Sequence, residues 1–192
     1  MVLRIQRREY THSCVFSFLQ KIYNHPSIEQ FSSGGLITFR VITVADRDGV
    51  AEVIAAYMEM PMGNKVANHA GYGGLVVEFD LKKQEFLEVF AKKPVPSVFT
   101  KHPETGALVT GENLDVWPAL SELSVQAHRA FPGVFAIGWD VVYTEDGAML
   151  LEGNTRWGSR LAFFVGRNAY VRKYLELLRD EQAQGNPLRK LL

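Results

Sequence analysis

Asp140, Glu152 and Asn154 are the residues whose types and spacing could support chemistry. They lie in, or directly after, two runs of β-forming residues, Val134 to Tyr143 and Ala148 to Gly153, which the sequence predicts to form a hairpin. Because strand side chains alternate between the two faces of a sheet, Glu152 and Asn154 share one face.

The turn between the two runs sets their register. A three-residue loop over 145–147, with its glycine in the left-handed conformation, predicts that Thr144 pairs with Ala148. Equal steps along both strands then place Asp140 opposite Glu152, with their β-carbons about 5 Å apart. A different turn would move Glu152 out of this register.

Two like charges directly opposite each other in a sheet are unfavourable unless something relieves the repulsion. A raised pKa of one carboxyl group would do so, and so would a divalent cation between the two groups. Asn154 adds a neutral oxygen on the same face, and an all-oxygen set is typical of sites for hard cations. The alternative is a solvated hairpin edge with ordinary surface acids.

The segment from Gly138 to Asn154 resembles the metal-binding end of ATP-grasp enzymes, and most closely the sugar-transfer-associated ATP-grasp subfamily, which is found with polysaccharide biosynthesis genes. The resemblance runs from about residue 6 to about residue 158. Further segments resemble the subfamily in the same order: the strand that contains Arg40, Asn68 followed by Gly73 and Gly74, and the loop His102-Pro103-Glu104-Thr105-Gly106 with Gly111 and Trp117.

The resemblance implies an ATP-dependent carboxylate ligase, which forms an acyl phosphate that an amine or similar nucleophile then attacks. It implies ATP and Mg²⁺ (or Mn²⁺) as cofactors, with the metal held by Asp140, Glu152 and Asn154. Arg40 would be catalytic, since its planar fork of donors suits phosphate or acyl-phosphate oxygens. The residues implied to bind the nucleotide are Gln6, Arg7, Arg8, Asn68, Gly73 and Gly74.

Structural interpretations stand beside these roles. Arg40 could be an arginine on an exposed strand face, and the glycine pair could be a plain turn before a strand. His102 precedes a proline in a glycine-containing turn, which is typical of a structural histidine, and His69 is equally open. After Asn154 the chain departs from the family pattern, because Trp157 replaces a proline and two arginines flank it at positions 156 and 160.

The resemblance covers the C-terminal half of the ATP-grasp fold, and the chain contains no flexible glycine-rich loop with a lysine pair before it. We therefore keep a second hypothesis, a non-catalytic half-fold that binds nucleotide or a protein partner. Under either hypothesis, the chain without a covering lobe should transfer the γ-phosphate of ATP negligibly. It should also associate as a homo-oligomer or with a complementing lobe. The substrate partner expected besides ATP is a small molecule with a carboxylate group or a sugar-linked substrate.

Alternating and helical periodicities predict the elements that must position these residues. We expect an α+β domain over residues 1–180 with a polar tail over 181–192, built as an antiparallel sheet with helices on one face, like the C-terminal lobe of the ATP-grasp fold. Besides the hairpin, the expected strands are Val2–Gln6, Leu36–Val44, Val50–Met58, Gly71–Asp80 and Gln84–Phe90, and the expected helices are Cys14–Tyr23, Trp117–Phe131 and Val171–Leu178.

Composition excludes several classes of protein. The 192 residues are 47% hydrophobic and 22% charged, which is ordinary for a globular domain and argues against disorder. Twenty-one basic residues balance 21 acidic ones, so nothing favours nucleic-acid binding. The single cysteine, Cys14, excludes an internal disulfide framework and favours a reducing, cytoplasmic compartment. No apolar run is long enough to span a membrane.

Overall fold

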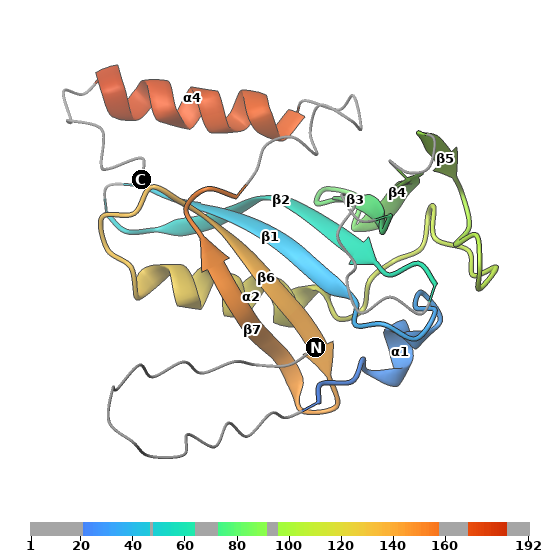
Figure 1. The fold of residues 1–192 in the computed structure, drawn as a ribbon. Helices are drawn as coiled ribbons and strands as arrows, with labels where there is room; N and C mark the ends of the chain where they lie inside the picture. The colour runs from blue at the N-terminus through green and yellow to red at the C-terminus, as the bar shows by residue number, and fades with distance from the viewer. Residues whose placement is uncertain (1–20, 47, 64–72, 92–95, 158–168, 184–192) are drawn as a thin grey trace, which may run out of the picture.

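The computed structural model describes residues 21–46, 48–63, 73–91, 96–157 and 169–183. In these ranges the chain forms a seven-stranded antiparallel sheet in the order β5-β4-β3-β2-β1-β6-β7 (Figure 1). The strands are β1 (Thr38–Ala45), β2 (Ala51–Met60), β3 (Leu75–Asp80), β4 (Glu85–Ala91), β5 (Ser97–Phe99), β6 (Ala136–Thr144) and β7 (Gly147–Asn154). The helices are α1 (Pro26–Glu29), α2 (Trp117–Arg129) and α4 (Ala169–Ala183). None of the helices in the described ranges is long and apolar enough to cross a membrane.

The α+β class and the antiparallel sheet are therefore confirmed. The predicted hairpin forms as β6 paired with β7, and the strands expected over 36–44 and 50–58 pair with each other as β1 and β2. The β1–β2 turn is closed by a hydrogen bond from the Asp46 N–H to the Val50 carbonyl. Gly49 has a φ of +78°, which residues other than glycine rarely adopt. The expected strand Val2–Gln6 lies outside the described residues.

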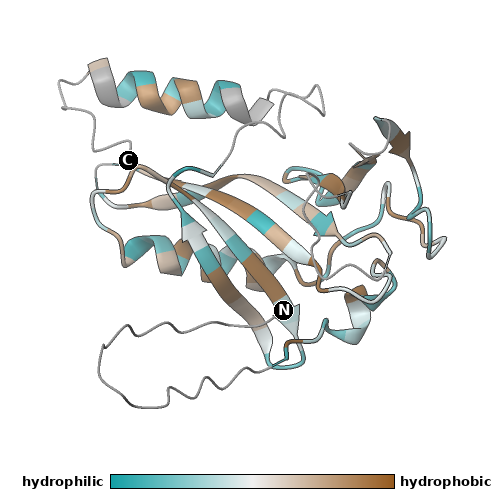
Figure 2. Cartoon of the chain, viewed as in Figure 1, coloured by the Kyte–Doolittle hydropathy of each residue, from teal (hydrophilic) through white to brown (hydrophobic). Residues whose placement is uncertain are grey.

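Helix α2 covers one face of the sheet. Trp117 and Leu120 of α2 are buried against alternate residues of β1, including Phe39 and Val41, in the larger of two hydrophobic clusters. Figure 2 shows hydrophobic residues concentrated along the strands, while hydrophilic residues alternate with them on the helices. The predicted helix over 117–131 is thus confirmed and ends slightly earlier, at Arg129.

Helix α4 lies against the opposite face, which corrects the expectation that the helices share one face. Tyr174 and Leu178 of α4 pack on a second cluster that contains Ile42 and Val44, the residues that alternate with Val41 in β1. Figure 1 accordingly shows the sheet between α2 and α4. The periodicity predicted an apolar stripe on each helix, but a stripe alone does not tell which sheet face it covers. Helix α4 also continues to Ala183, past the start of the expected polar tail.

The segment before β1 differs from its prediction. Lys21 to Tyr23, the described end of the helix expected over 14–23, is not helical. Pro26 instead begins the single-turn helix α1, where its missing N–H costs nothing. His25 caps this helix, since its Nδ1 accepts a hydrogen bond from the Ser27 N–H at 3.1 Å. The rest of the expected helix lies outside the described residues.

A buried polar network joins α2 to the centre of the sheet. The Thr43 hydroxyl lies 2.7 Å from His128 Nδ1 and accepts a hydrogen bond from Trp139 Nε1 at 2.9 Å. His128 Nε2 lies 3.0 Å from the Val134 carbonyl oxygen. All these contacts are satisfied by a neutral imidazole that carries its proton on Nε2. Burial lowers the pKa of His128, which agrees with a neutral ring.

We expect His128 to make the protein less stable in mild acid. Its lowered pKa means that the unfolded chain takes up a proton near pH 6.5 while the folded protein resists it. The stabilisation is therefore complete above about pH 6.5 and declines as the pH falls below it. Urea unfolding at about pH 7 and about pH 5 should show a larger loss of stability for the wild type than for His128→Gln. Equal losses would contradict this assignment.

Candidate functional site

A β-bulge in the β6–β7 hairpin brings Glu152 opposite Asp140. Val141 pairs with Leu150 and Asp140 pairs with Glu152, so Leu151 is an extra residue in β7. In a regular strand Leu150 and Glu152, two residues apart, would point to the same face. With the bulge, Leu150 packs in the cluster below α2 while Glu152 lies on the opposite face with Asp140. Bulges re-aim side chains in this way next to functional sites.

The predicted partnership of Asp140 and Glu152 is therefore confirmed, but the register that predicted it is wrong at the turn. Thr144 pairs with Gly147, and Ala148 pairs with Tyr143 instead. The Thr144 hydroxyl accepts a hydrogen bond from the Asp146 N–H and donates one to the Gly147 carbonyl, which closes a tighter turn than expected. The turn is one residue shorter than predicted, and the bulge adds one residue to β7, so the two deviations cancel at Asp140.

One row of paired residues crosses five strands on this face of the sheet. Asp140 pairs with Arg40 of β1, Arg40 with Tyr57 of β2, and Tyr57 with Glu78 of β3. With Glu152, the row reads Glu152, Asp140, Arg40, Tyr57, Glu78. Arg40 is the only cation among these five residues; Asp140 adjoins it on one side, and on the other side Glu78 follows after Tyr57.

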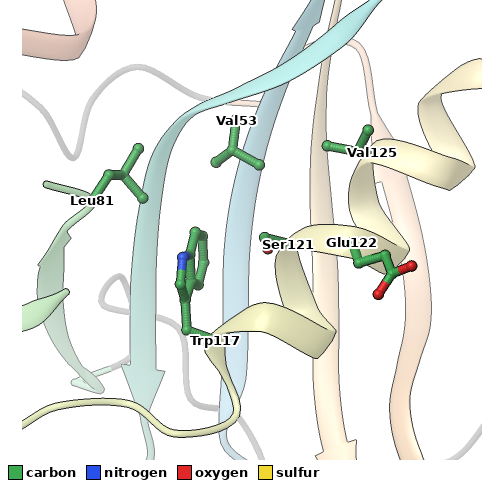
Figure 3. Close-up of a pocket in the computed structure, with 6 residues that line it drawn as sticks. All are labelled: Val53, Leu81, Trp117, Ser121, Glu122 and Val125. Atoms are coloured by element: carbon green, nitrogen blue, oxygen red, sulfur yellow. The ribbon is translucent and has the colours of Figure 1, made fainter.

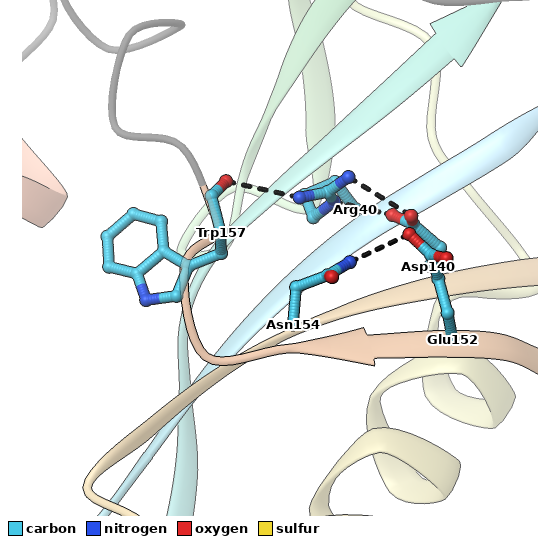
Figure 4. A network of polar contacts seen from close by, with 5 residues as sticks. All are labelled: Arg40, Asp140, Glu152, Asn154 and Trp157. Atoms are coloured by element: carbon cyan, nitrogen blue, oxygen red, sulfur yellow. Dashed lines mark hydrogen bonds and ion pairs between the residues drawn. The ribbon is translucent and has the colours of Figure 1, made fainter. Parts of the chain in front are cut away.

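Arg40 and Asp140 form a two-pronged ion pair (Figure 4). Arg40 Nε donates to Asp140 Oδ1 at 2.5 Å, and one terminal nitrogen donates to Oδ2 at 3.0 Å. The other terminal nitrogen donates to the Trp157 main-chain carbonyl at 3.1 Å. The side chains of Arg40 and Asp140 are only 10% and 13% exposed. The guanidinium is thus held in one plane by a carboxylate and a carbonyl, and the predicted placement of Arg40 beside the acidic pair is confirmed.

Asp140 is a carboxyl group with a strongly shifted pKa. Burial raises its pKa to about 6, and a hydrogen bond with Glu152 and the charge of Glu59 act in the same direction, while Arg40 opposes them. Asn154 donates from its side-chain amide to Glu152 Oε1 at 2.8 Å. This contact fixes which end of the amide is nitrogen, so the Asn154 side-chain oxygen is the end available as a ligand.

The sequence reasoning missed three residues of this face: Tyr57, Glu59 and Glu78. Tyr57 is 2% exposed and Glu59 is 4% exposed. Glu59 pairs with Thr38, two residues from Arg40 in β1, which puts it on the same face. A carboxylate in a run of apolar residues was the available signal, because a buried glutamate in a central strand is rarely there for packing.

The donor set fits a hard divalent cation. Asp140, Glu152 and Asn154 offer carboxylate and amide oxygens on neighbouring strands, the ligand type that Mg²⁺ prefers. No group of three or more His, Cys, Asp or Glu residues suited to a metal occurs in the described part of the chain. A site here would therefore depend on two carboxylates and the amide, completed by water or substrate oxygens, as is usual for Mg²⁺.

Other predicted site residues are only partly placed. Gln6, Arg7, Arg8, Asn68 and the open candidate His69 lie outside the described residues. Gly73 and Gly74 immediately precede β3. Gly74 is four positions from Glu78, about 13 Å along an extended chain, so the glycines do not join the row of Arg40. Their predicted contact with nucleotide stays a prediction.

His102 is a structural residue of its turn. Its ring is 1% exposed, and Nδ1 accepts hydrogen bonds from the N–H groups of Glu104 and Thr105 at 3.2 Å. Nε2 faces the Pro61 carbonyl at 3.4 Å. Burial lowers the pKa of His102, in keeping with a neutral ring that organises the loop.

A shallow pocket of about 380 Å³ lies on the opposite side of the sheet (Figure 3). It is formed between β2, the β3–β4 turn and α2, and its lining residues are Val53, Leu81, Trp117, Ser121, Glu122 and Val125. These belong to the α2 side, whereas Arg40 and Asp140 lie on the α4 side. The pocket is therefore separate from the polar site.

We expect the removal of one partner of the Arg40–Asp140 pair to be costly, because it leaves the other charge buried alone. Replacing Arg40 by Met leaves the Asp140 carboxylate buried without its cation, which should cost about 3–5 kcal/mol of stability. Changing Asp140 to Asn as well should restore more than half of that loss. Urea unfolding of both variants at pH 7 measures it, and a double variant no more stable than Arg40→Met would refute the pairing argument.

Comparison with known proteins supplies the family. The family model described as sugar-transfer associated ATP-grasp matches residues 11–172. No curated protein and no solved structure matches the chain. The family match includes every residue of the Arg40, Asp140, Glu152 and Asn154 group and spans most of the 192 residues. The chain therefore belongs to the sugar-transfer associated ATP-grasp family.

Proposed function

We propose that this ATP-grasp chain supplies the metal- and phosphate-binding part of an ATP-dependent carboxylate ligase. The observation that carries the proposal is the set of hard oxygen ligands on Asp140, Glu152 and Asn154, next to the guanidinium of Arg40 on one sheet face. In the proposed reaction a substrate carboxylate oxygen bonds to the γ-phosphorus of ATP as the bond to ADP breaks. An amine or similar nucleophile then attacks the acyl carbon, phosphate leaves, and the nucleophile loses its proton.

Asp140, Glu152 and Asn154 would hold Mg²⁺. When bound, the ion would neutralise phosphate charge during transfer of the phosphoryl group. The row gives a reason for these residues to take up a cation. Asp140 pairs with Glu152 across the hairpin, and the charge of Glu59 raises the pKa of Asp140 against the effect of Arg40. A divalent cation would relieve this repulsion.

Arg40 would contact phosphate or acyl-phosphate oxygens. Its planar fork already holds a carboxylate by two parallel hydrogen bonds, and a phosphate presents two oxygens in a similar geometry. If Asp140 turned its oxygens to a metal ion, those two N–H donors would become available to an anion such as a phosphate.

The proposed substrate is a carboxylate-bearing small molecule or a sugar-linked compound. The proposed setting is polysaccharide biosynthesis, which is compatible with a family described as associated with sugar transfer. We place the reaction in the cytoplasm, because ATP is the phosphoryl donor and the single cysteine favours a reducing compartment. The second candidate is a non-catalytic module that binds nucleotide or a protein partner. The intact Arg40–Asp140 site favours catalysis or descent from a catalyst.

We expect Glu152→Gln to weaken Mn²⁺ binding, because the variant loses one of two ligand charges. The same change should slightly stabilise the metal-free protein by removing repulsion with Asp140. Titration calorimetry with Mn²⁺ and urea unfolding check the two effects. Glu122→Gln is the matched control, since Glu122 is exposed on α2 at the other side of the sheet. Equal Mn²⁺ affinities for Glu152→Gln and wild type would exclude Glu152 as a ligand.

ADP release separates the two candidate functions. The purified 192-residue chain, with Mg²⁺ and ATP, should bind nucleotide weakly and turn it over no faster than an Asp140→Asn blank, because an open site lets water screen the charges that act on the phosphates. Turnover well above the blank would show that these residues suffice for catalysis. If the chain is part of a ligase, addition of a complementing lobe or a candidate carboxylate substrate should raise ADP release by the wild type and not by Asp140→Asn. A non-catalytic module should show no such increase.

A further inference from the structure

Trp157 contacts Arg40 on the side of the guanidinium away from Asp140 (Figure 4). Its main-chain carbonyl accepts the third hydrogen bond of the guanidinium, at 3.1 Å, while Asp140 takes the other two. Figure 4 shows the Trp157 carbonyl and Asp140 on opposite sides of the guanidinium. The carbonyl is uncharged and belongs to the backbone, so it does not compete for a cation as the carboxylate does.

Gly138 allows Trp157 to reach this position. Gly138 is on β6, two residues before Asp140 and opposite Ile42 of β1. A Cβ at Gly138 would lie 2.2 Å from the Cβ of Trp157 and 3.1 Å from its Cγ. Real side chains do not approach so closely, so Trp157 lies directly on the bare backbone of β6. Here glycine is required by a close approach between chain segments.

Helix α4 holds Trp157 from the other side. The Trp157 and Tyr174 rings meet edge to face, with centroids 5.5 Å apart, and Tyr174 also packs on Phe135 at 5.5 Å. Trp157 and Tyr174 both pack against the cluster of Ile42 and Val44. The Trp157 ring packs between the sheet and α4, which leaves it few alternative rotamers. This packing also restricts the Trp157 main chain.

We infer that Trp157 is a positioning residue for Arg40. The main-chain carbonyl of Trp157 would keep the Arg40 guanidinium on the site face if Asp140 turned to a metal ion. This inference rests on the proposed function. The pair with Asp140 alone would leave Arg40 without an anchor at the moment when its two donors are needed for phosphate. With the Trp157 carbonyl in place, one bond holds the guanidinium while the other two donors change partners. Gly138 and Tyr174 act by fixing Trp157.

The first test examines the free protein by nitrogen-15 NMR of the arginine side chains. Three hydrogen bonds should slow rotation about the Arg40 Nε–Cζ bond, so its terminal nitrogens should give separate signals, assigned by their loss in Arg40→Lys. Because Asp140 still holds two of the three donors, Trp157→Ala and Gly138→Ala should speed this rotation and broaden these signals relative to the wild type, whereas Trp157→Phe, which keeps a ring against Tyr174, should preserve them. Leu175→Ala is the control, because Leu175 is 42% exposed on α4. Signals as sharp in Trp157→Ala as in the wild type would overturn the inference.

The second test compares the metal alone with the metal–nucleotide complex by calorimetry. Trp157→Ala should weaken Mg–ATP binding about tenfold, the effect of losing one charge-assisted hydrogen bond, and leave Mn²⁺ binding within about twofold of wild type. Trp157→Phe should restore Mg–ATP affinity. Unchanged Mg–ATP affinity in Trp157→Ala, or a parallel loss of Mn²⁺ and Mg–ATP, would overturn the inference. A wild type that binds no Mg–ATP would instead refute the proposed function and the metal-linked part of the inference, while the NMR comparison still decides the positioning role.

If Gly138→Ala does not fold, the two Trp157 variants carry both tests, since neither adds an atom to the crowded contact at Gly138. Both variants keep the main-chain carbonyl, so any difference between them comes from how firmly the side chain fixes it. Emission from Trp157 adds a direct reporter, because Trp117 and Trp139 belong to the cluster on the other face. Mg–ATP should change the emission of the wild type and leave that of Trp157→Phe unchanged. An equal change in both proteins would count against a link between Trp157 and the site.

Discussion

The ion pair between Arg40 and Asp140 is the interaction on which this face of the sheet depends. It joins the neighbouring strands β1 and β6 through two hydrogen bonds, and both side chains are almost fully withdrawn from water. A pair of this kind adds little net stability, yet removal of one partner leaves a buried charge and is costly. A ligand that binds Arg40 or Asp140 in place of its partner must therefore be accompanied by a second charge that pairs with the group left behind.

That requirement connects the structure with ATP-grasp chemistry. Mg²⁺ and a phosphate carry the same two kinds of charge as Arg40 and Asp140. In the proposed function the metal would replace the guanidinium at the carboxylate, and the phosphate would replace the carboxylate at the guanidinium. Such an exchange would keep each buried charge next to a counter-charge. Glu152 and Asn154 would add oxygens for the metal, while the Trp157 carbonyl accepts a hydrogen bond from the guanidinium on the other side.

Much of this site could be predicted from the sequence, because side-chain alternation in a strand is a local property. Alternation predicted that Arg40 lies on the face opposite Phe39. The pairing of Asp140 with Glu152 was predicted from a regular register, and it holds because the shorter turn at Thr144 and the bulge at Leu151 cancel. Neither the turn nor the bulge could be predicted, since both depend on which hydrogen bonds the assembled hairpin makes. The row through Tyr57 and Glu78 also escaped prediction, because it follows from the order of strands in the sheet. Which face of the sheet α4 covers likewise depends on how the helix packs in the assembled fold, and not on the sequence pattern of the helix.

The most direct measurement of the central claim is paramagnetic broadening of NMR signals by Mn²⁺. The three indole N–H signals, of Trp117, Trp139 and Trp157, report on both faces of the sheet, and Arg40 Nε–H and the Asn154 side-chain amide report on the site itself. If the ion binds at Asp140, Glu152 and Asn154, substoichiometric Mn²⁺ should broaden the Arg40 and Asn154 signals first and Trp157 next, with Trp117 little affected. Uniform broadening, or broadening that begins at Trp117, would contradict the account.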